Sequence, residues 1–336
     1  MIDDHLYSPT LPESDPVNEC FLCGTLLTPE TRTKEHVYPR WLIRKIGLQR
    51  ESLKSPFTGT KTPYSRIIVP ACRSCNTVHL RVLESRVQRA LVHNRIEDAT
   101  LSWADMCVWA AKVLYGTVLY DFLQADARSR DILAAFLHRH DFALMRAALQ
   151  SLVGRVHFIG DSGFPASHQR FDVKVPRNPT DRFGLTTNPF GGALAIRAEH
   201  IGLLVTFDGG YVSTYGRDFI DRYRDRALHP AQFEELAADW LYMSELRTGV
   251  FNVSQSVSDD GTTLLDYSEP LLQRALDQMG KFRAFEAYDP RRRAVWVSAT
   301  TGCSFEQVYG GEESITWLHG RDDVEFVDMD IEGPRH

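Results

Sequence analysis

Two Cys-x-x-Cys pairs constrain the fold of this chain more than any other feature of its sequence. They are Cys20/Cys23 and Cys72/Cys75, with residues 24–71 between them. Paired cysteines at this spacing bind zinc more often than they form disulfides, and four thiolates suit a tetrahedral structural ion. Gly24, directly after the first pair, would let the backbone turn and offer its N–H to sulfur. We therefore predict one zinc ion held by both pairs, and we expect the isolated Cys107 and Cys303 to be core residues.

The segment that contains the four cysteines reads as a small module, residues 17–97, after a loose leader, residues 1–16. The helix expected from Asn76 onward places Leu80, Leu83, Val87 and Leu91 on one apolar stripe. The other elements expected here are a strand over Lys34–Pro39, a helix over Trp41–Leu48 that stops near Gly47, a loop over residues 50–65 and a strand over Arg66–Pro70.

Three polar residues lie where the two cysteine pairs would bring them together. Glu35 and His36 fall between the pairs, and Asn76 follows the second pair directly. A carboxylate and an amide oxygen suit Mg²⁺ or Mn²⁺, and a neutral imidazole beside them suits a general base. His79 lies on the same helical side as Asn76. It could be a ligand of the catalytic metal, a phosphate contact or a structural histidine, whereas Glu84, two turns on, is expected to lie too far away.

The order Cys-x-x-Cys, Glu35-His36-Val-x-Pro, Pro-x-Cys-x-x-Cys-Asn76 resembles the HNH (ββα-metal) endonuclease superfamily. Within it, the order is similar to the branch with two zinc knuckles that includes phage junction-resolving endonucleases. The resemblance covers about 80 residues and implies two strands and a helix around one catalytic metal ion. It implies that His36 activates water, that Glu35 and Asn76 bind the metal, that the four cysteines bind zinc, and that cleavage leaves 5′-phosphate and 3′-hydroxyl ends.

Charge is distributed unevenly along the chain. The net charge is −6, yet fourteen Lys and Arg and only three Glu lie between Arg32 and Arg95, against 24 basic and 41 acidic residues elsewhere. A basic segment on an acidic chain favours a nucleic-acid partner. DNA is the first candidate, and the charge pattern leaves RNA open. The candidates for contacts to backbone phosphates are Lys34, Arg40, Arg44, Arg81, Arg86 and Arg89.

The expected location is the cytoplasm, with no membrane partner. The first ten residues, MIDDHLYSPT, are acidic and polar, unlike the basic and then apolar order of a signal peptide. The longest apolar stretch, Trp103–Leu123, contains Asp105, Lys112 and Asp121. We therefore expect it to be a buried helix and not a membrane span.

Residues 98–336 are expected to form an α+β domain, helices first and then mostly antiparallel strands, with a subdivision open near residues 230–250. Asp208-Gly-Gly210 reads as a hairpin turn. The expected helices cover residues 102–123, 127–152 with a break near 140–141, 218–227, 230–247 and 269–279, and the expected strands cover residues 155–159, 171–175, 193–197, 201–207, 211–214, 251–257 and 295–299. No motif here indicates a reaction, so a role in restraining or targeting the nuclease, in self-association or in binding a protein partner is a hypothesis, as is a defence effector.

The alternative interpretation is a non-catalytic zinc-knuckle module that binds nucleic acid or protein. Glu35 and His36 would then only orient the knuckle. Asn76 would be present because asparagine tolerates a left-handed turn like that of Gly24.

Overall fold

The structure is a computed structural model that describes residues 16–45, 47–93, 102–159, 164–311, 316–319 and 326–329. The predicted leader, apart from Pro16, lies outside these residues, as do Arg95 and the predicted boundary between residues 97 and 98. The chain forms two compact units. Unit 1 comprises residues 1–166, 207–209 and 251–268, and unit 2 comprises residues 167–206, 210–250 and 269–336. The α+β class is confirmed, since both units combine helices with strands.

Unit 1 begins with two antiparallel strands, β1 (Arg32–His36) and β4 (Ile68–Cys72), which pair from Arg32↔Cys72 to His36↔Ile68. Between them lie α1 (Arg40–Lys45) and a small hairpin of β2 (Ser52–Lys54) and β3 (Lys61–Pro63). The expected loop over residues 50–65 therefore contains a hairpin. The Ser, Thr, Pro and Gly content of this segment predicts a loop and does not show that Leu53 pairs with Thr62.

After β4 the chain turns into a π-helical segment, η3 (Cys75–Leu80), and continues as α2 (Arg81–His93). The predicted apolar stripe is confirmed, because Leu80, Leu83, Val87 and Leu91 are all buried. The order of two antiparallel strands followed by a helix thus occurs in unit 1.

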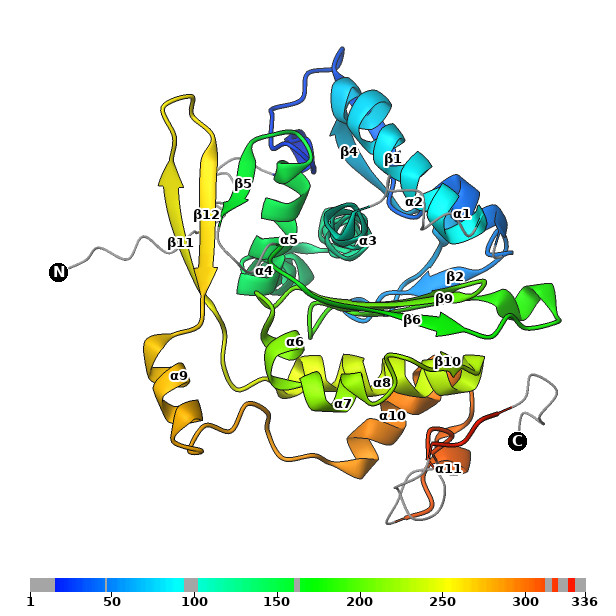
Figure 1. The fold of residues 1–336 in the computed structure, drawn as a ribbon. Helices are drawn as coiled ribbons and strands as arrows, with labels where there is room; N and C mark the ends of the chain where they lie inside the picture. The colour runs from blue at the N-terminus through cyan, green and yellow to red at the C-terminus, as the bar shows by residue number, and fades with distance from the viewer. Residues whose placement is uncertain are drawn as a thin grey trace. The chain divides into compact units, whose positions relative to one another are not determined.

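The long helix α3 (Trp103–Gln124) forms the centre of unit 1. A capping box of Ser102 and Asp105 starts it, as the sequence predicts for Ser102. In Figure 1 it is seen end-on, with α4 (Ala127–Leu137) and α5 (His140–Ser151) on one side and β4 and α2 on another. It is the one described helix long and apolar enough to cross a membrane, and 89% of its apolar window is buried inside the structure. The prediction of a buried helix is therefore confirmed.

A three-stranded sheet completes unit 1, with order β11 (Asn252–Val257), β12 (Thr263–Ser268) and β5 (Val156–Ile159). The β11–β12 pair is antiparallel, and β12 runs parallel to β5. The chain thus returns to unit 1 to complete a sheet begun about a hundred residues earlier.

Unit 2 is a five-stranded sheet covered by helices. The strand order is β10 (Ala227–Leu228), β6 (Ser167–Val173), β9 (Ile201–Thr206), β8 (Ala193–Ala198) and β7 (Phe183–Asn188). All neighbours are antiparallel except β10 and β6. Helix α8 (Pro230–Leu246) packs on β8 and β9, and α10 (Pro290–Thr301) packs along α8 (Figure 1). The remaining helices are α6 (Tyr211–Tyr215), α7 (Arg217–Asp221), α9 (Leu271–Gln278) and α11 (Phe305–Val308).

Two strand predictions in unit 2 are wrong. Tyr211–Thr214 is the helix α6, held by a hydrogen bond from the Ser213 N–H to the Ser167 hydroxyl, so Asp208-Gly-Gly210 does not close a hairpin. Residues 295–299 belong to α10, which Asp289 caps by accepting from the N–H groups of Arg291 and Arg292. A tertiary hydrogen bond in the first case and a local helix cap in the second thus outweigh the β propensity of the valines and aromatic residues.

Candidate functional site

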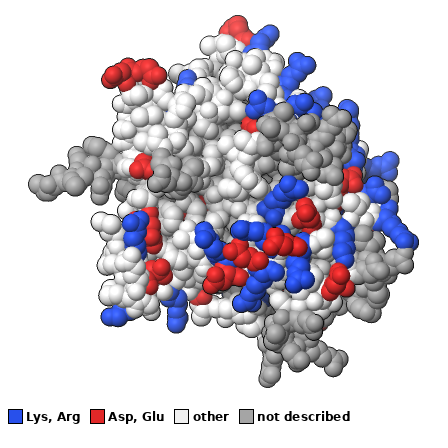
Figure 2. Space-filling model, viewed as in Figure 1, with Lys and Arg blue, Asp and Glu red and all other residues white. Residues whose placement is uncertain are grey.

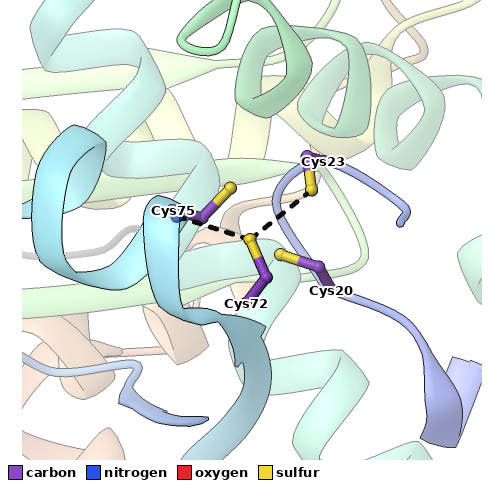
Figure 3. A group of neighbouring side chains, drawn as sticks. All are labelled: Cys20, Cys23, Cys72 and Cys75. Carbon is purple, nitrogen blue, oxygen red and sulfur yellow. Dashed lines mark hydrogen bonds between the residues drawn. The ribbon is translucent and has the colours of Figure 1, made fainter. Parts of the chain in front are cut away.

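The four cysteines converge, as the sequence predicts. Their sulfur atoms all lie within 4.8 Å of one another, and Cys23 Sγ is 3.9 Å from Cys72 Sγ. Figure 3 shows the side chains turned toward a common point, two from the first knuckle and two from the junction of β4 with η3. A tetrahedral ion with metal–sulfur distances of about 2.3 Å requires sulfurs at this kind of separation. The group can therefore hold a metal ion.

Backbone contacts fix the two knuckles against each other. The Phe21 N–H donates to the Pro70 carbonyl at 3.0 Å, and the Cys75 N–H points at Cys72 Sγ at 3.4 Å. Gly24 has a φ of 70° and donates its N–H to the Cys20 carbonyl at 2.8 Å. The expected turn at Gly24 is thus present, but its N–H closes the turn and does not reach sulfur.

The crowding of the thiols has an electrostatic consequence. Shared hydrogen bonds with Cys20 and Cys75 lower the pKa of the Cys23 thiol. Hydrogen bonds with Cys20 and Cys23 raise the pKa of Cys75, and the contact with Cys23 raises the pKa of Cys20 to about 11. The Cys23 thiolate is therefore stabilised, whereas the thiols of Cys20 and Cys75 are harder to deprotonate. Four thiolates at this spacing require a cation among them.

Residues far along the chain support the first knuckle. Arg155 donates to the Cys23 carbonyl and, at 2.8 Å, to the Thr25 hydroxyl. Arg146 on α5 lies 3.7 Å from the Glu19 carboxylate and is nearly buried. The cysteine module therefore rests on α5 and the start of β5, within the same compact unit.

Asn76 is fastened to β1. Its Nδ2 donates to the Thr33 hydroxyl at 3.0 Å and to the Lys34 carbonyl at 3.2 Å. Thr33 and Glu35 lie two residues apart and therefore on the same face of β1. Glu199 is the one non-glycine residue with positive φ in the described part of the chain, so Asn76 does not adopt the left-handed turn of the alternative interpretation.

Glu35 is buried and paired with a lysine of α3. Lys112 Nζ lies 2.6 Å from Glu35 Oε1 and also contacts Glu84 Oε1, and the Lys112 side chain has an exposed fraction of 0%. The expectation that Glu84 lies too far from the site is wrong, because this one ammonium group joins the Glu84 carboxylate to that of Glu35. Burial, the largest cause, raises the pKa of Glu84, and the positive charge of Lys112 opposes the rise.

His36 ends β1 and is half-buried. Its pKa is lowered, first by burial and then by the positive charges of Arg40 and Lys112. The imidazole is therefore neutral at neutral pH, which is the form that accepts a proton. By strand alternation it points to the face opposite Glu35, but as the last residue of the strand it lies within electrostatic reach of Glu84 and Lys112.

His79 lies in η3 and is half-buried. Within the described ranges, the four cysteines form the only group of three or more His, Cys, Asp or Glu side chains close enough to share a metal ion. His79 thus does not join Glu35 and Glu84 in such a group, and its role as a ligand stays a prediction.

Most of the predicted phosphate contacts are exposed. These are Lys34, Arg40, Arg44, Arg81 and Arg89. Arg86 differs, because it is half-buried and lies 3.3 Å from the Asp105 carboxylate. In Figure 2 lysine and arginine atoms gather along the upper right edge, over α2 and α1. The exposed residues of the basic segment thus form a basic surface on unit 1. Arg86 is instead paired with Asp105.

No protein-family model, curated protein or solved structure matches this chain.

Sequence reasoning missed the contribution of α3 to this site. Lys112 stands within a long apolar stretch, and a charged residue at a buried helical position requires a partner of opposite charge. That requirement was the available signal. It pointed to a carboxylate elsewhere, and the structure identifies two, Glu35 and Glu84.

Proposed function

We propose that this protein is a metal-dependent endonuclease that hydrolyses phosphodiester bonds of nucleic acid, with DNA as the first candidate substrate. The observation that carries the proposal is the attachment of Asn76 to Thr33 and Lys34 of β1, the residues that precede Glu35 and His36 in the strand. The convergence of the cysteines produces this attachment, since Asn76 follows Cys75 and β1 pairs with the strand that ends at Cys72.

Zinc is the ion proposed for the cysteine site. Four cysteine sulfurs within 4.8 Å of one another are typical of structural zinc, which stabilises small modules that have little core of their own. The ion would hold the first knuckle, the end of β4 and the start of η3 together, and through them the position of Asn76.

Glu35 and Asn76 would hold the catalytic ion. The donor set fits Mg²⁺ or Mn²⁺, because it offers a carboxylate oxygen and an amide oxygen and leaves positions for water. The Asn76 hydrogen bonds to β1 use Nδ2 and leave Oδ1 as a donor atom for a metal. When bound, such an ion supplies positive charge against the developing charge of the phosphoryl group.

His36 would act as the general base that takes a proton from the attacking water. Because the pKa of His36 is lowered, its ring is mostly neutral at neutral pH and can accept a proton. Exposed arginines on the same unit, such as Arg40 and Arg81, would hold the substrate by its phosphates without reading its sequence.

The first test is the substitution His36→Ala, assayed by nicking of plasmid DNA with Mg²⁺ or Mn²⁺. We expect cutting to fall by at least a hundredfold, the usual contribution of a general base, while the zinc content stays unchanged. His138→Ala, an exposed histidine at the end of α4, is the matched control and should cut normally. Equal cutting by the wild type and the His36 variant would remove His36 from the mechanism.

The alternative, a non-catalytic zinc-binding module, has one observation in its favour. Glu35 is already paired with Lys112, as a purely structural carboxylate would be. This alternative predicts binding of nucleic acid or protein, with no divalent ion bound at Glu35 and no cutting by any preparation.

A further inference from the structure

Two carboxylates and one lysine form a cluster that includes Glu35, a proposed ligand of the catalytic ion. Glu35 comes from β1, Glu84 from α2 and Lys112 from α3. The Lys112 ammonium contacts one oxygen of each carboxylate. Three separate elements thus converge on a single buried positive charge.

Because these side chains are buried, leaving any of their charges without a partner would destabilise the fold. The Lys112 side chain is 0% exposed, and the side chains of Glu35 and Glu84 are 10% and 21% exposed. A buried ammonium group without partners is strongly unfavourable, so Lys112 requires at least one of the two carboxylates. Two carboxylates and one ammonium leave the cluster with a net charge of −1, the same as a single carboxylate.

The position of Lys112 is fixed by the packing of α3. One turn further on, Gly116 lies against Val37, and the next residue, Thr117, shares a hydrogen bond of 3.1 Å with the Tyr38 hydroxyl. These contacts hold α3 against the residues that directly follow Glu35 and His36. The backbone of Lys112 is therefore held close to β1 by the packing of the central helix.

We propose that Lys112 is a positioning residue that holds Glu35 and Glu84 together and limits how tightly the site binds a divalent cation. The inference rests on the proposed function, because it assumes that Glu35 binds the ion. A cation that reaches Glu35 shares the carboxylate with a fixed ammonium a few ångströms away, and the two positive charges repel each other. Glu84 is the second carboxylate that offsets this repulsion.

Binding of Mn²⁺ to the zinc-loaded full-length protein tests the proposal without relying on cutting. Free Mn²⁺ is measured by its electron paramagnetic resonance signal, and zinc content and thermal unfolding report on the fold. Lys112→Met should tighten Mn²⁺ binding at least tenfold, since two carboxylates then face the ion without a competing charge. Glu84→Gln should weaken it several-fold, because Lys112 then pairs with Glu35 alone.

Two further variants separate charge from packing. The double substitution Lys112→Met with Glu84→Gln restores a net charge of −1 and should bind Mn²⁺ nearly as the wild type does. Arg139→Met removes a cation from another ion pair of unit 1, with Asp141 at 2.8 Å, and should leave Mn²⁺ affinity unchanged. Unchanged Mn²⁺ affinity in folded Lys112→Met overturns the proposal, and if that variant does not fold, unchanged affinity in Glu84→Gln overturns it.

The same titration distinguishes failure of the inference from failure of the proposed function. Glu35→Gln and Asn76→Ala should both weaken Mn²⁺ binding. If neither does, the proposed metal site is wrong and the role of Lys112 falls with it. If both do, while Lys112→Met and Glu84→Gln bind as the wild type, only the role of Lys112 is refuted.

Discussion

Buried ionisable side chains determine much of the chemistry available to unit 1. Lys112 is satisfied by two carboxylates, whereas Asp121, nine residues further along α3, is held by one hydroxyl, that of Ser55 at 2.6 Å. The Ser55 oxygen also accepts from the N–H groups of Phe57 and Thr58. Asp121 thus organises the turn between β2 and β3 and at the same time carries a charge that burial disfavours.

The pKa of Asp121 is raised, chiefly by burial, and the hydrogen bond from Ser55 opposes the rise only in part. A raised pKa means that the folded protein holds this proton more tightly than the unfolded chain does. The contribution to stability is therefore present at low pH and is lost as the pH rises through the pKa of the folded state. Relative to the wild type, Asp121→Asn should therefore gain stability as the pH is raised from about 3 to about 8, a range that starts below the ordinary aspartate pKa of about 3.9.

Urea unfolding at the two pH values measures this change. Asp131→Asn, an exposed position on α4, serves as the control and should show no such trend. The explanation would be contradicted by a stability difference between the Asp121 variant and the wild type that stays constant, or shrinks, as the pH rises.

At the residue scale, the sequence was informative where the chemistry of metal coordination fixes the spacing of the ligand residues. The two Cys-x-x-Cys pairs allowed the grouping of four thiols to be predicted, and the structure confirms it. The pairing of Glu35 and Glu84 with Lys112 could not be predicted in the same way. It depends on where α3 lies relative to β1 and α2, and no local pattern encodes that position.

At the scale of elements, α3 is the surface on which the cysteine module rests. The residues that contact the module are spread along the length of the helix, at Lys112, Gly116 and Asp121. Glycine is required at the middle position because a Cβ there would lie 2.9 Å from Val37 Cγ2. Val37 is fully buried and β-branched, so it has little freedom to move aside.

Gly116→Ala should therefore destabilise the protein by about 1–2 kcal/mol, although alanine in a helix is intrinsically better than glycine by about 1 kcal/mol. In a Val37→Ala background the clash is absent, and the same substitution should become neutral or stabilising. A double-mutant cycle by chemical denaturation measures this reversal of sign. If Gly116→Ala has the same effect in both backgrounds, the close approach of α3 to Val37 does not limit stability.

Elements with strong local signals were predicted well, and those set by tertiary contacts were not. The capped start of α3, the break between α4 and α5, and the apolar stripe of α2 were all found from spacing and caps. The β2–β3 hairpin was missed because its strands are three residues each. The strand β7 was missed because Phe183–Asn188 contains one glycine and two threonines and lacks a strong apolar alternation.

At the scale of the whole molecule, basic residues are concentrated in one segment of the chain. The segment from Arg32 to Arg95 is strongly basic within a chain of net charge −6. Acidic residues elsewhere would repel a polyanion, so an approaching nucleic acid would be steered to the basic surface of unit 1. This steering needs no sequence-specific contact. It therefore predicts binding that is sensitive to salt and tolerant of sequence.

The salt dependence of DNA binding tests this distribution directly. Each phosphate contact contributes about 0.9 to the slope of log affinity against log salt concentration, because it releases a bound counterion. Arg81 and Arg89 are exposed on α2, so Arg81→Gln with Arg89→Gln should reduce the slope by about 2 if both contact phosphate.

The matched control removes two exposed arginines of unit 2, Arg217 on α7 and Arg222 directly after it, by Arg217→Gln with Arg222→Gln. The net charge changes by the same amount in both pairs, so total charge alone would alter the two slopes equally. DNA contact at the basic surface would alter only the slope of the Arg81/Arg89 variant. The slopes are measured over a range of salt concentrations in the His36→Ala background, which is predicted not to cut. Equal slopes for the two pairs of variants would mean that DNA does not bind specifically at the basic surface.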